Sequence, residues 1–278
     1  CPACAEALRL MKEPETAENR PDAEVDYLKK ARRHTRYVGA LCGIGMLVIG
    51  ILLIFSRVYL FGSASDPEDG NYRVSVAGNL VSVSGNLLGR TSGVARVVFE
   101  ESGGVVDVKV RTAPKAFFNS NAVDGRYTAG GSVALVRCGE LILWEDGAAI
   151  SRTAAELYAA KNPYVGDMAA NGKLASVLGI SDQLGPYTNE LQTSAEPYGW
   201  TLDLKTRISA QDESAAREIM AADSYVMLAA VGNLGAVTWR YPADAGRREY
   251  TVTAEDAAAF AGKDIKQCAA SAAELQSL

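Results

Sequence analysis

The sequence predicts a single-pass membrane protein whose extracytoplasmic part is a β-rich region followed by an α+β domain. Three observations predict this fold class. One uninterrupted apolar segment covers residues 37–55. Beyond it, residues 72–150 are rich in Val, Gly, Ser and Thr with period-two alternation, which is typical of short antiparallel strands. From residue 151 onward, helical and strand patterns alternate, as they do in α+β domains.

The composition narrows the class of protein. The chain has 278 residues, 48% of them hydrophobic, with 28 Lys and Arg against 33 Asp and Glu and a net charge of −5. Enough apolar material is present to build a core, which argues against a disordered protein. The acidic balance also argues against direct nucleic acid binding.

The apolar segment, residues 37–55, is predicted to be a transmembrane helix. Its nineteen residues carry no charge, and at 1.5 Å per residue they span about 28 Å, close to the thickness of a bilayer core. A buried core helix would keep a polar stripe, and a signal peptide has a shorter apolar stretch. We therefore expect a stable membrane anchor.

The flanks of the segment predict its orientation. Basic side chains crowd its N-terminal side, namely Lys29, Lys30, Arg32, Arg33 and Arg36. Positive charge stays inside, so the N-terminus is expected in the cytoplasm and the C-terminus outside the cell membrane. Within the segment, Gly39 and Gly43 are spaced as in helix-pairing motifs, which leaves a homodimer open.

The cytoplasmic piece begins with Cys1 and Cys4, and the absence of an initiator Met predicts that it continues upstream. Thiolates at C-x-x-C spacing can fill two corners of a tetrahedral zinc site. A thioredoxin-type pair has the same spacing but needs a βαβ unit, and none surrounds this one. We divide this piece into a zinc-finger-like end, residues 1–12, and a linker with a basic juxtamembrane segment, residues 13–36.

The run C-P-A-C-A-E-A-L-R-L, a linker, a basic stretch and one membrane helix together resemble the end of the zinc-finger domain of membrane-bound anti-sigma factors. The resemblance implies zinc as cofactor, Cys1 and Cys4 as its last two ligands, and a sigma factor as cytoplasmic partner. In that family a His lies four residues before the first Cys, and this sequence does not contain that position.

Residues 66–150 are predicted to form the β-rich domain. The pattern of Ser75–Leu80 recurs as Ser82–Leu87, which indicates two strand-turn units. Two segments, Val94–Phe99 and Val105–Arg111, flank a Ser-Gly-Gly turn and predict a hairpin. A second strand pair is predicted from Val133–Arg137 and Glu140–Trp144, to either side of Cys138-Gly139.

Residues 151–278 are predicted to form the α+β domain. Capping-box sequences begin at Thr153 and Thr253, and each predicts a helix start. A long helix is expected over Asp212–Val231. Further segments are a helix over Ala169–Leu178 and strands over Glu190–Thr193, Trp200–Leu204, Ala236–Tyr241 and Glu249–Val252.

Several motifs of this domain resemble a bacterial extracytoplasmic domain family of unknown function. They are N-P-Y-V-G-D at 162–167, L-Q-T at 191–193, E-P-Y-G at 196–199 and G-K-D at 262–264. The resemblance covers roughly residues 155–278. That family follows a membrane helix in uncharacterised proteins of Gram-positive bacteria and has no established chemistry.

The outer region lacks histidine, because His34 is the only one in the chain. Imidazole bases, Ser-His pairs and His-based metal sites are therefore excluded there, and we expect no enzyme. A His-free hydrolase survives as an alternative. The two outer cysteines, Cys138 and Cys268, could pair in an oxidising compartment, but two cysteines do not make a framework.

Five residues are candidates for a ligand-facing patch, because aromatic rings beside carboxylates can stack on a sugar or hold a cationic group. They are Tyr164, Asp167, Glu196, Tyr198 and Trp200. The competing interpretation is structural: the Pro-Tyr pairs are turns with a packed ring.

Two functional hypotheses follow. The first is a membrane regulator similar to an anti-sigma factor, which holds a transcription factor inside and senses an envelope signal outside. The second is an anchored extracytoplasmic binding or scaffold protein with no transcriptional role. The sequence does not identify the outer ligand or protein partner.

Overall fold

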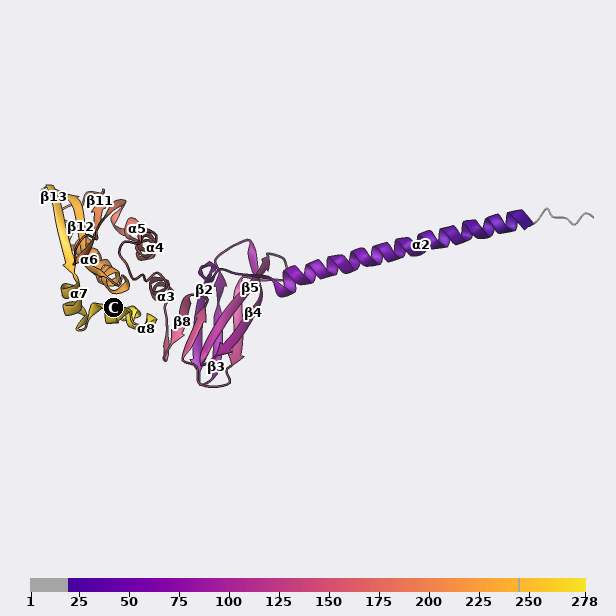
Figure 1. The fold of residues 1–278 in the computed structure, drawn as a ribbon, viewed down its shortest axis with the longest axis horizontal. Helices are drawn as coiled ribbons and strands as arrows, with labels where there is room; N and C mark the ends of the chain where they lie inside the picture. Colours follow the sequence, from indigo (N-terminus) through magenta and orange to yellow (C-terminus); the bar gives the residue numbers. More distant parts are fainter. Residues whose placement is uncertain (1–19, 245) are drawn as a thin grey trace, which may run out of the picture. The chain divides into compact units, whose positions relative to one another are not determined.

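The computed structural model describes residues 20–244 and 246–278. The chain divides into two compact units, with the boundary between Val58 and Tyr59. Figure 1 shows one long helix in the first unit and two sheet-containing regions in the second.

The described part of the first unit is helix α2 (Arg20–Phe55) with the start of the π-helical stretch η1 (Ser56–Phe61), which runs across the unit boundary. Within it, Tyr27–Phe61 is long and apolar enough to cross a bilayer, and its most apolar window is not buried inside the protein. The predicted apolar helix is therefore confirmed and is compatible with a membrane anchor. Its orientation stays a prediction.

The first region of the second unit is built from nine strands and one short 3-10 turn, η2 (Pro67–Asp69). The strands are β1 (Ser63–Ala64), β2 (Gly70–Ala77), β3 (Leu80–Leu87), β4 (Ser92–Ser102), β5 (Val105–Pro114), β6 (Ala122–Thr128), β7 (Leu135–Cys138), β8 (Leu141–Glu145) and β9 (Ala148–Ala149). One sheet has the order β2-β3-β6, and a second runs β1-β5-β7-β8-β9 with β4 also paired to β5. Valines from both sheets share one buried cluster, so the region is a β-sandwich.

Turn chemistry explains the hairpins of the sandwich. Between β4 and β5, Gly103 and Gly104 have φ of 59° and 82°, which glycine adopts without strain. Gly125 has another role: a Cβ at this position would lie 2.9 Å from the ring of Phe99, so the small residue lets β6 approach β4 closely. The predicted hairpin of residues 94–111 is confirmed.

The second region combines a four-stranded sheet with helices. Its strands are β10 (Tyr187–Gln192), β11 (Tyr198–Leu204), β12 (Leu234–Ala243) and β13 (Gly246–Thr253), in that order across the sheet. Its helices are α3 (Arg152–Ala159), α4 (Met168–Leu178), α5 (Ile180–Leu184), α6 (Glu213–Ala230), α7 (Ala254–Ala261), η3 (Ile265–Ala269) and α8 (Ala272–Gln276). The central strands β11 and β12 are parallel and joined through α6, while both outer pairs are antiparallel.

One face of this sheet is covered by α6 and is mainly apolar. Trp200, Leu202 and Trp239 are completely buried in it. The Trp239 indole donates to Ser224 Oγ of α6 at 2.8 Å, and the Ser224 hydroxyl donates to the Met220 carbonyl at 2.6 Å. The Trp239 indole and the Ser224 hydroxyl are thus both satisfied where α6 packs on the sheet, whereas Asp223 of the same helix has a buried oxygen without a hydrogen-bond partner.

Of the two predicted N-caps, the one of α7 is confirmed and the one of α3 is not. Thr253 forms a full capping box with Asp256, as predicted. The prediction that Thr153 caps α3 is wrong, because Ser151 is the N-cap and accepts from the Ala154 amide. A serine two residues upstream provides the same hydroxyl acceptor.

Two helices of the α+β region complete the core of the sandwich. Ala154 and Ala155 of α3 and Ala272 of α8 lie in the same buried cluster as the sandwich valines. Arg152 donates to the Glu68 and Gly70 carbonyls at 3.0 and 3.2 Å. The Gln276 side chain accepts from the Ser151 amide at 2.5 Å and donates to the Ala149 carbonyl at 3.1 Å. The two regions therefore pack as one body.

Candidate functional site

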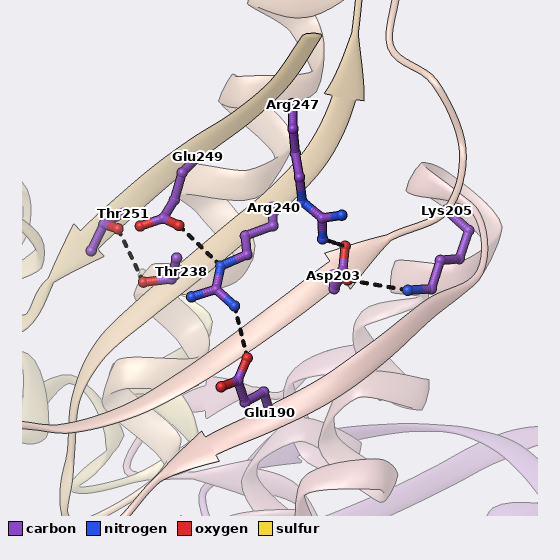
Figure 2. Close-up of polar contacts among 8 residues, drawn as sticks. All are labelled: Glu190, Asp203, Lys205, Thr238, Arg240, Arg247, Glu249 and Thr251. Atoms are coloured by element: carbon purple, nitrogen blue, oxygen red, sulfur yellow. Dashed lines mark hydrogen bonds and ion pairs between the residues drawn. The ribbon is translucent and has the colours of Figure 1, made fainter.

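The strongest candidate site is the face of the β10–β13 sheet opposite α6, which we call the open face. Alternation along the strands fixes its members, since buried and non-buried residues alternate along β11 and β12. Across the strands, Glu190 pairs with Thr201, Thr201 with Thr238 and Thr238 with Thr251. The next row joins Asp203 to Arg240 and Arg240 to Glu249. The side chains drawn in Figure 2 are all polar.

Arg240 lies at the centre of the open face and bridges two strands. Its Nη1 lies 2.7 Å from Glu190 of β10, and its Nε lies 3.0 Å from Glu249 of β13. These carboxylates raise the pKa of Arg240, with the hydrogen bond to Glu249 the largest cause. One guanidinium thus holds two acids on opposite sides of it (Figure 2).

Asp203 forms a second charged group with the opposite arrangement. It accepts Arg247 at 2.5 Å and Lys205 at 3.1 Å. The hydrogen bond from Arg247 is the largest influence and lowers the pKa of Asp203. The open face therefore presents a cation between two anions beside an anion between two cations.

The threonines between these charges complete the surface. Thr238 and Thr251 hydroxyls lie 3.0 Å apart. Hydroxyls that donate and accept, next to exposed charges of both signs, can bind a polar partner through hydrogen bonds and ion pairs.

A second feature is the loop of residues 162–167, which buried asparagines hold in place. Asn162 donates to Asn171 at 3.3 Å, and Asn171 donates to the Val165 carbonyl at 2.5 Å. Asn233 accepts the Val165 amide at 2.7 Å. This network leaves the Tyr164 ring 67% exposed at the tip of a fixed loop.

A pocket of about 370 Å³ lies beside this loop and contains two lysines, Lys161 and Lys266. The Lys266 ammonium donates to the carbonyls of Leu228, Val231 and Leu234, at 2.5, 2.7 and 2.8 Å. Lys161 donates to the Ala269 carbonyl and lies over the Tyr158 ring. All three Lys266 donors are used by carbonyls at the end of α6 and the start of β12, so this group caps the helix and is not available as a nucleophile.

The five predicted ligand-facing residues lie in different environments. Tyr164 is exposed, and Asp167 accepts from the Ala169 and Ala170 amides as the N-cap of α4. Glu196 is exposed and Tyr198 is partly buried. Trp200 is 0% exposed, and its indole donates to Asn189 at 2.8 Å, so this ring belongs to the core and cannot stack on a ligand at the surface.

The two Pro-Tyr loops nevertheless flank a common turn, residues 231–235, which includes the first two residues of β12. A Cβ on Gly232 would lie 2.9 Å from the Pro163 carbonyl, and one on Gly235 would lie 2.7 Å from the Pro197 ring. Both loops therefore pack against this turn, which requires small residues at both positions.

The remaining predicted sites are placed as follows. Cys1 and Cys4 lie outside the described residues. Gly39 and Gly43 have open space around them on α2, and helix pairing stays a prediction. Cys138 and Cys268 are free thiols in separate buried clusters.

The charged residues of the open face were not predicted as a group. The alternation in W-T-L-D-L, residues 200–204, and A-V-T-W-R-Y, residues 236–241, could have identified them, because every second residue is polar.

Residues 157–253 match a protein family described as "Domain of unknown function (DUF4825)". The chain carries a DUF4825 domain. All four strands β10–β13, and so the whole open face, lie inside the DUF4825 domain, as does the loop of residues 162–167. The resemblance to a domain family of unknown function is confirmed for this segment. Neither a curated protein nor a solved structure matches the chain.

Proposed function

We propose that this chain is a membrane-anchored extracytoplasmic binding protein whose DUF4825 domain holds a polar partner on the open face. The observation that carries the proposal is the arrangement of Arg240 between Glu190 and Glu249 on an uncovered sheet. Sheet scaffolds hold side chains at fixed spacing, so a partner meets a preorganised surface. We propose recognition and no catalysis at this face.

The chemistry of the face points to a ligand that carries both carboxylate and ammonium groups. The ligand carboxylate would replace Glu190 or Glu249 on the Arg240 guanidinium, in the planar geometry that arginine favours. The ligand ammonium would lie against the released acid. Short peptides with free ends or charged side chains satisfy both requirements, and the stem peptides of bacterial cell walls are of this kind.

Co-sedimentation of the full chain in detergent with purified peptidoglycan sacculi tests the proposal. Arg240→Glu places a third carboxylate between Glu190 and Glu249 and is expected to lower the bound fraction at least about tenfold. The matched control is Arg137→Glu, which breaks a comparable ion pair with Asp107, 2.7 Å long, in the β-sandwich. Absence of sedimentation, or equal loss in both variants, would contradict the proposal.

The anchor is proposed to have its N-terminus in the cytoplasm, supported by the basic flank of residues 29–36. A C-terminal alkaline phosphatase fusion, which is active only after export, tests this orientation. Activity of the C-terminal fusion and inactivity of an N-terminal one are expected, and the reverse pattern would contradict it.

A second candidate function is regulation by an anti-sigma-like mechanism, favoured by the C-x-x-C spacing of Cys1 and Cys4 next to a membrane helix. It requires zinc and a sigma-like subunit on the intact gene product. Cys1→Ser and Cys4→Ser are then expected to release that subunit. A full-length protein that holds no zinc and no cytoplasmic partner would contradict this second candidate, and only the binding function would remain.

A further inference from the structure

An exposed aromatic loop lies at the end of the β-sandwich where the chain enters it. The loop, residues 115–121 between β5 and β6, carries Phe117 and Phe118, which are 101% and 49% exposed. Their rings form an edge-to-face pair with centroids 5.1 Å apart. A fully exposed phenylalanine is costly in water, so this position calls for an explanation.

The loop is held in shape by its own hydrogen bonds. The Asn119 side chain accepts the Ala116 amide at 2.8 Å and donates to the Pro114 carbonyl at 3.0 Å. Asn119 also lies over Gly93, where a Cβ would be 2.5 Å from the Asn119 side chain. Phe117 is therefore presented outward by an ordered turn.

The aromatic loop lies next to the segment that follows the membrane helix. The rings of Phe118 and Tyr59 are in edge-to-face contact, with centroids 5.0 Å apart. The strand register also places the two segments close together, because Ser63 of β1 pairs with Thr112 of β5, three residues before the loop begins at Lys115. Tyr59 is four residues beyond Phe55, so the chain cannot place it more than about 14 Å from the end of the predicted span.

The side chains of the aromatic loop and of its neighbouring segments are largely apolar or basic. Leu60, Phe61 and Leu88 are 61%, 51% and 58% exposed. The loop of residues 88–91 runs beside the aromatic loop, because the Lys115 amide donates to the Thr91 carbonyl at 2.8 Å. These two loops contain Arg90 and Lys115 and no acidic residue.

From these observations we propose that Phe117 and Phe118 insert into the headgroup and upper acyl region of the bilayer in which α2 is anchored. Aromatic rings favour this interface, and Arg90 and Lys115 suit its anionic headgroups. The inference rests on the proposed membrane anchor. It adds a second contact that fixes the β-sandwich against the membrane surface.

Depth-dependent quenching tests this docking. Phe117→Trp is made in the full chain and reconstituted in vesicles of phosphatidylcholine and phosphatidylglycerol, with or without lipid brominated near the glycerol. The matched control is Tyr164→Trp, an exposed ring on the DUF4825 domain. Signal from the parent chain, which has Trp144, Trp200 and Trp239, is subtracted.

We expect the tryptophan at position 117 to be quenched at least about twofold more strongly than the one at position 164. Equal quenching in vesicles that carry the protein through a flotation gradient would overturn the docking and leave the anchor intact. A chain that does not float with the vesicles would overturn the anchor, and the docking with it. The Phe117 ring is fully exposed, so the far-UV circular dichroism of Phe117→Trp is expected to match that of the parent.

Discussion

Lys266 gives the chain a stability that should rise with pH, and this can be worked out from its surroundings. Burial lowers the pKa of the Lys266 ammonium from 10.5 to about 8, although Asp264 acts in the opposite direction. Below pH 8 the folded and unfolded chains both hold the proton. Between pH 8 and 10.5 only the unfolded chain holds it, so the free energy of unfolding increases with pH in this window.

The size of the effect follows from the two pKa values. From pH 7 to pH 9 the Lys266 contribution to the free energy of unfolding should rise by about 1.3 kcal/mol. Lys266→Met removes the titrating group while it keeps a long apolar side chain. We expect the variant to lose this increment, whatever its stability at pH 7.

Urea unfolding of the full chain in detergent, followed by tryptophan fluorescence, measures the difference. Trp200 and Trp239 are fully buried in the core that contains α6, so they report on the relevant region. The Cys138 thiol, whose pKa burial raises to about 11, also titrates in alkali, but it is common to both proteins. Lys205→Met, which removes an exposed ammonium, is the matched control and should respond to pH as wild type does. If Lys266→Met keeps the wild-type increase, the three carbonyls stabilise the ammonium enough to offset its burial and the reasoning is refuted.

Three further variants test other parts of the domain. Ser224→Ala leaves the buried Trp239 indole without its acceptor and should lower the free energy of unfolding by about 1–3 kcal/mol, seen as a lower urea midpoint; an unchanged midpoint would contradict this. Burial raises the pKa of Asp223 from 3.8 to about 6, so wild-type stability should fall as pH rises from about 4 to 6. Asp223→Asn should remove that dependence and raise the free energy of unfolding at pH 7.5 by up to about 3 kcal/mol, and a urea titration showing the same pH profile in both proteins would refute it. Asn171→Ala removes the donor to the Val165 carbonyl and should expose the loop of residues 162–167 to chymotrypsin at Tyr164, whereas equal cleavage rates would show that Asn233 alone holds the loop.

The elements with strong local signals could be predicted from the sequence. The long helix α6, the β4–β5 hairpin and the Thr253 cap each depend on residues close together in the chain. Hydrophobic periodicity, glycine turns and capping boxes involve residues only a few positions apart, so they can be recognised without knowledge of the tertiary structure. The predicted Thr153 cap was wrong because local signals can be ambiguous. Ser151 offers an equivalent hydroxyl two residues earlier, and the helix begins there.

The site was harder to predict because it depends on which face of the sheet is covered. Trp200 lies on the same face of β11 as Leu202 and Leu204, and all three side chains are buried under α6. The ring was nevertheless expected at the surface, since its neighbours Glu196 and Tyr198 suggested a ligand patch. Arg240 and Glu190 are 50 positions apart, and only the strand order brings them together. Cross-strand ion pairs of this kind require topology as well as pattern.

The packing of the two regions limits how a bound partner could affect the membrane helix. Arg152, Gln276 and the alanines of α3 and α8 join the sandwich to the α+β region through a common buried cluster and direct hydrogen bonds. A loose hinge between the regions would need these groups to separate and leave buried polar atoms without partners, which is costly. Binding at the open face is therefore expected to act on residues 59–278 as a body. Under the second candidate function and the proposed orientation, a signal would then reach the cytoplasm through a change in helix pairing at Gly39 and Gly43 or through cleavage near the membrane, rather than through rearrangement of the outer regions.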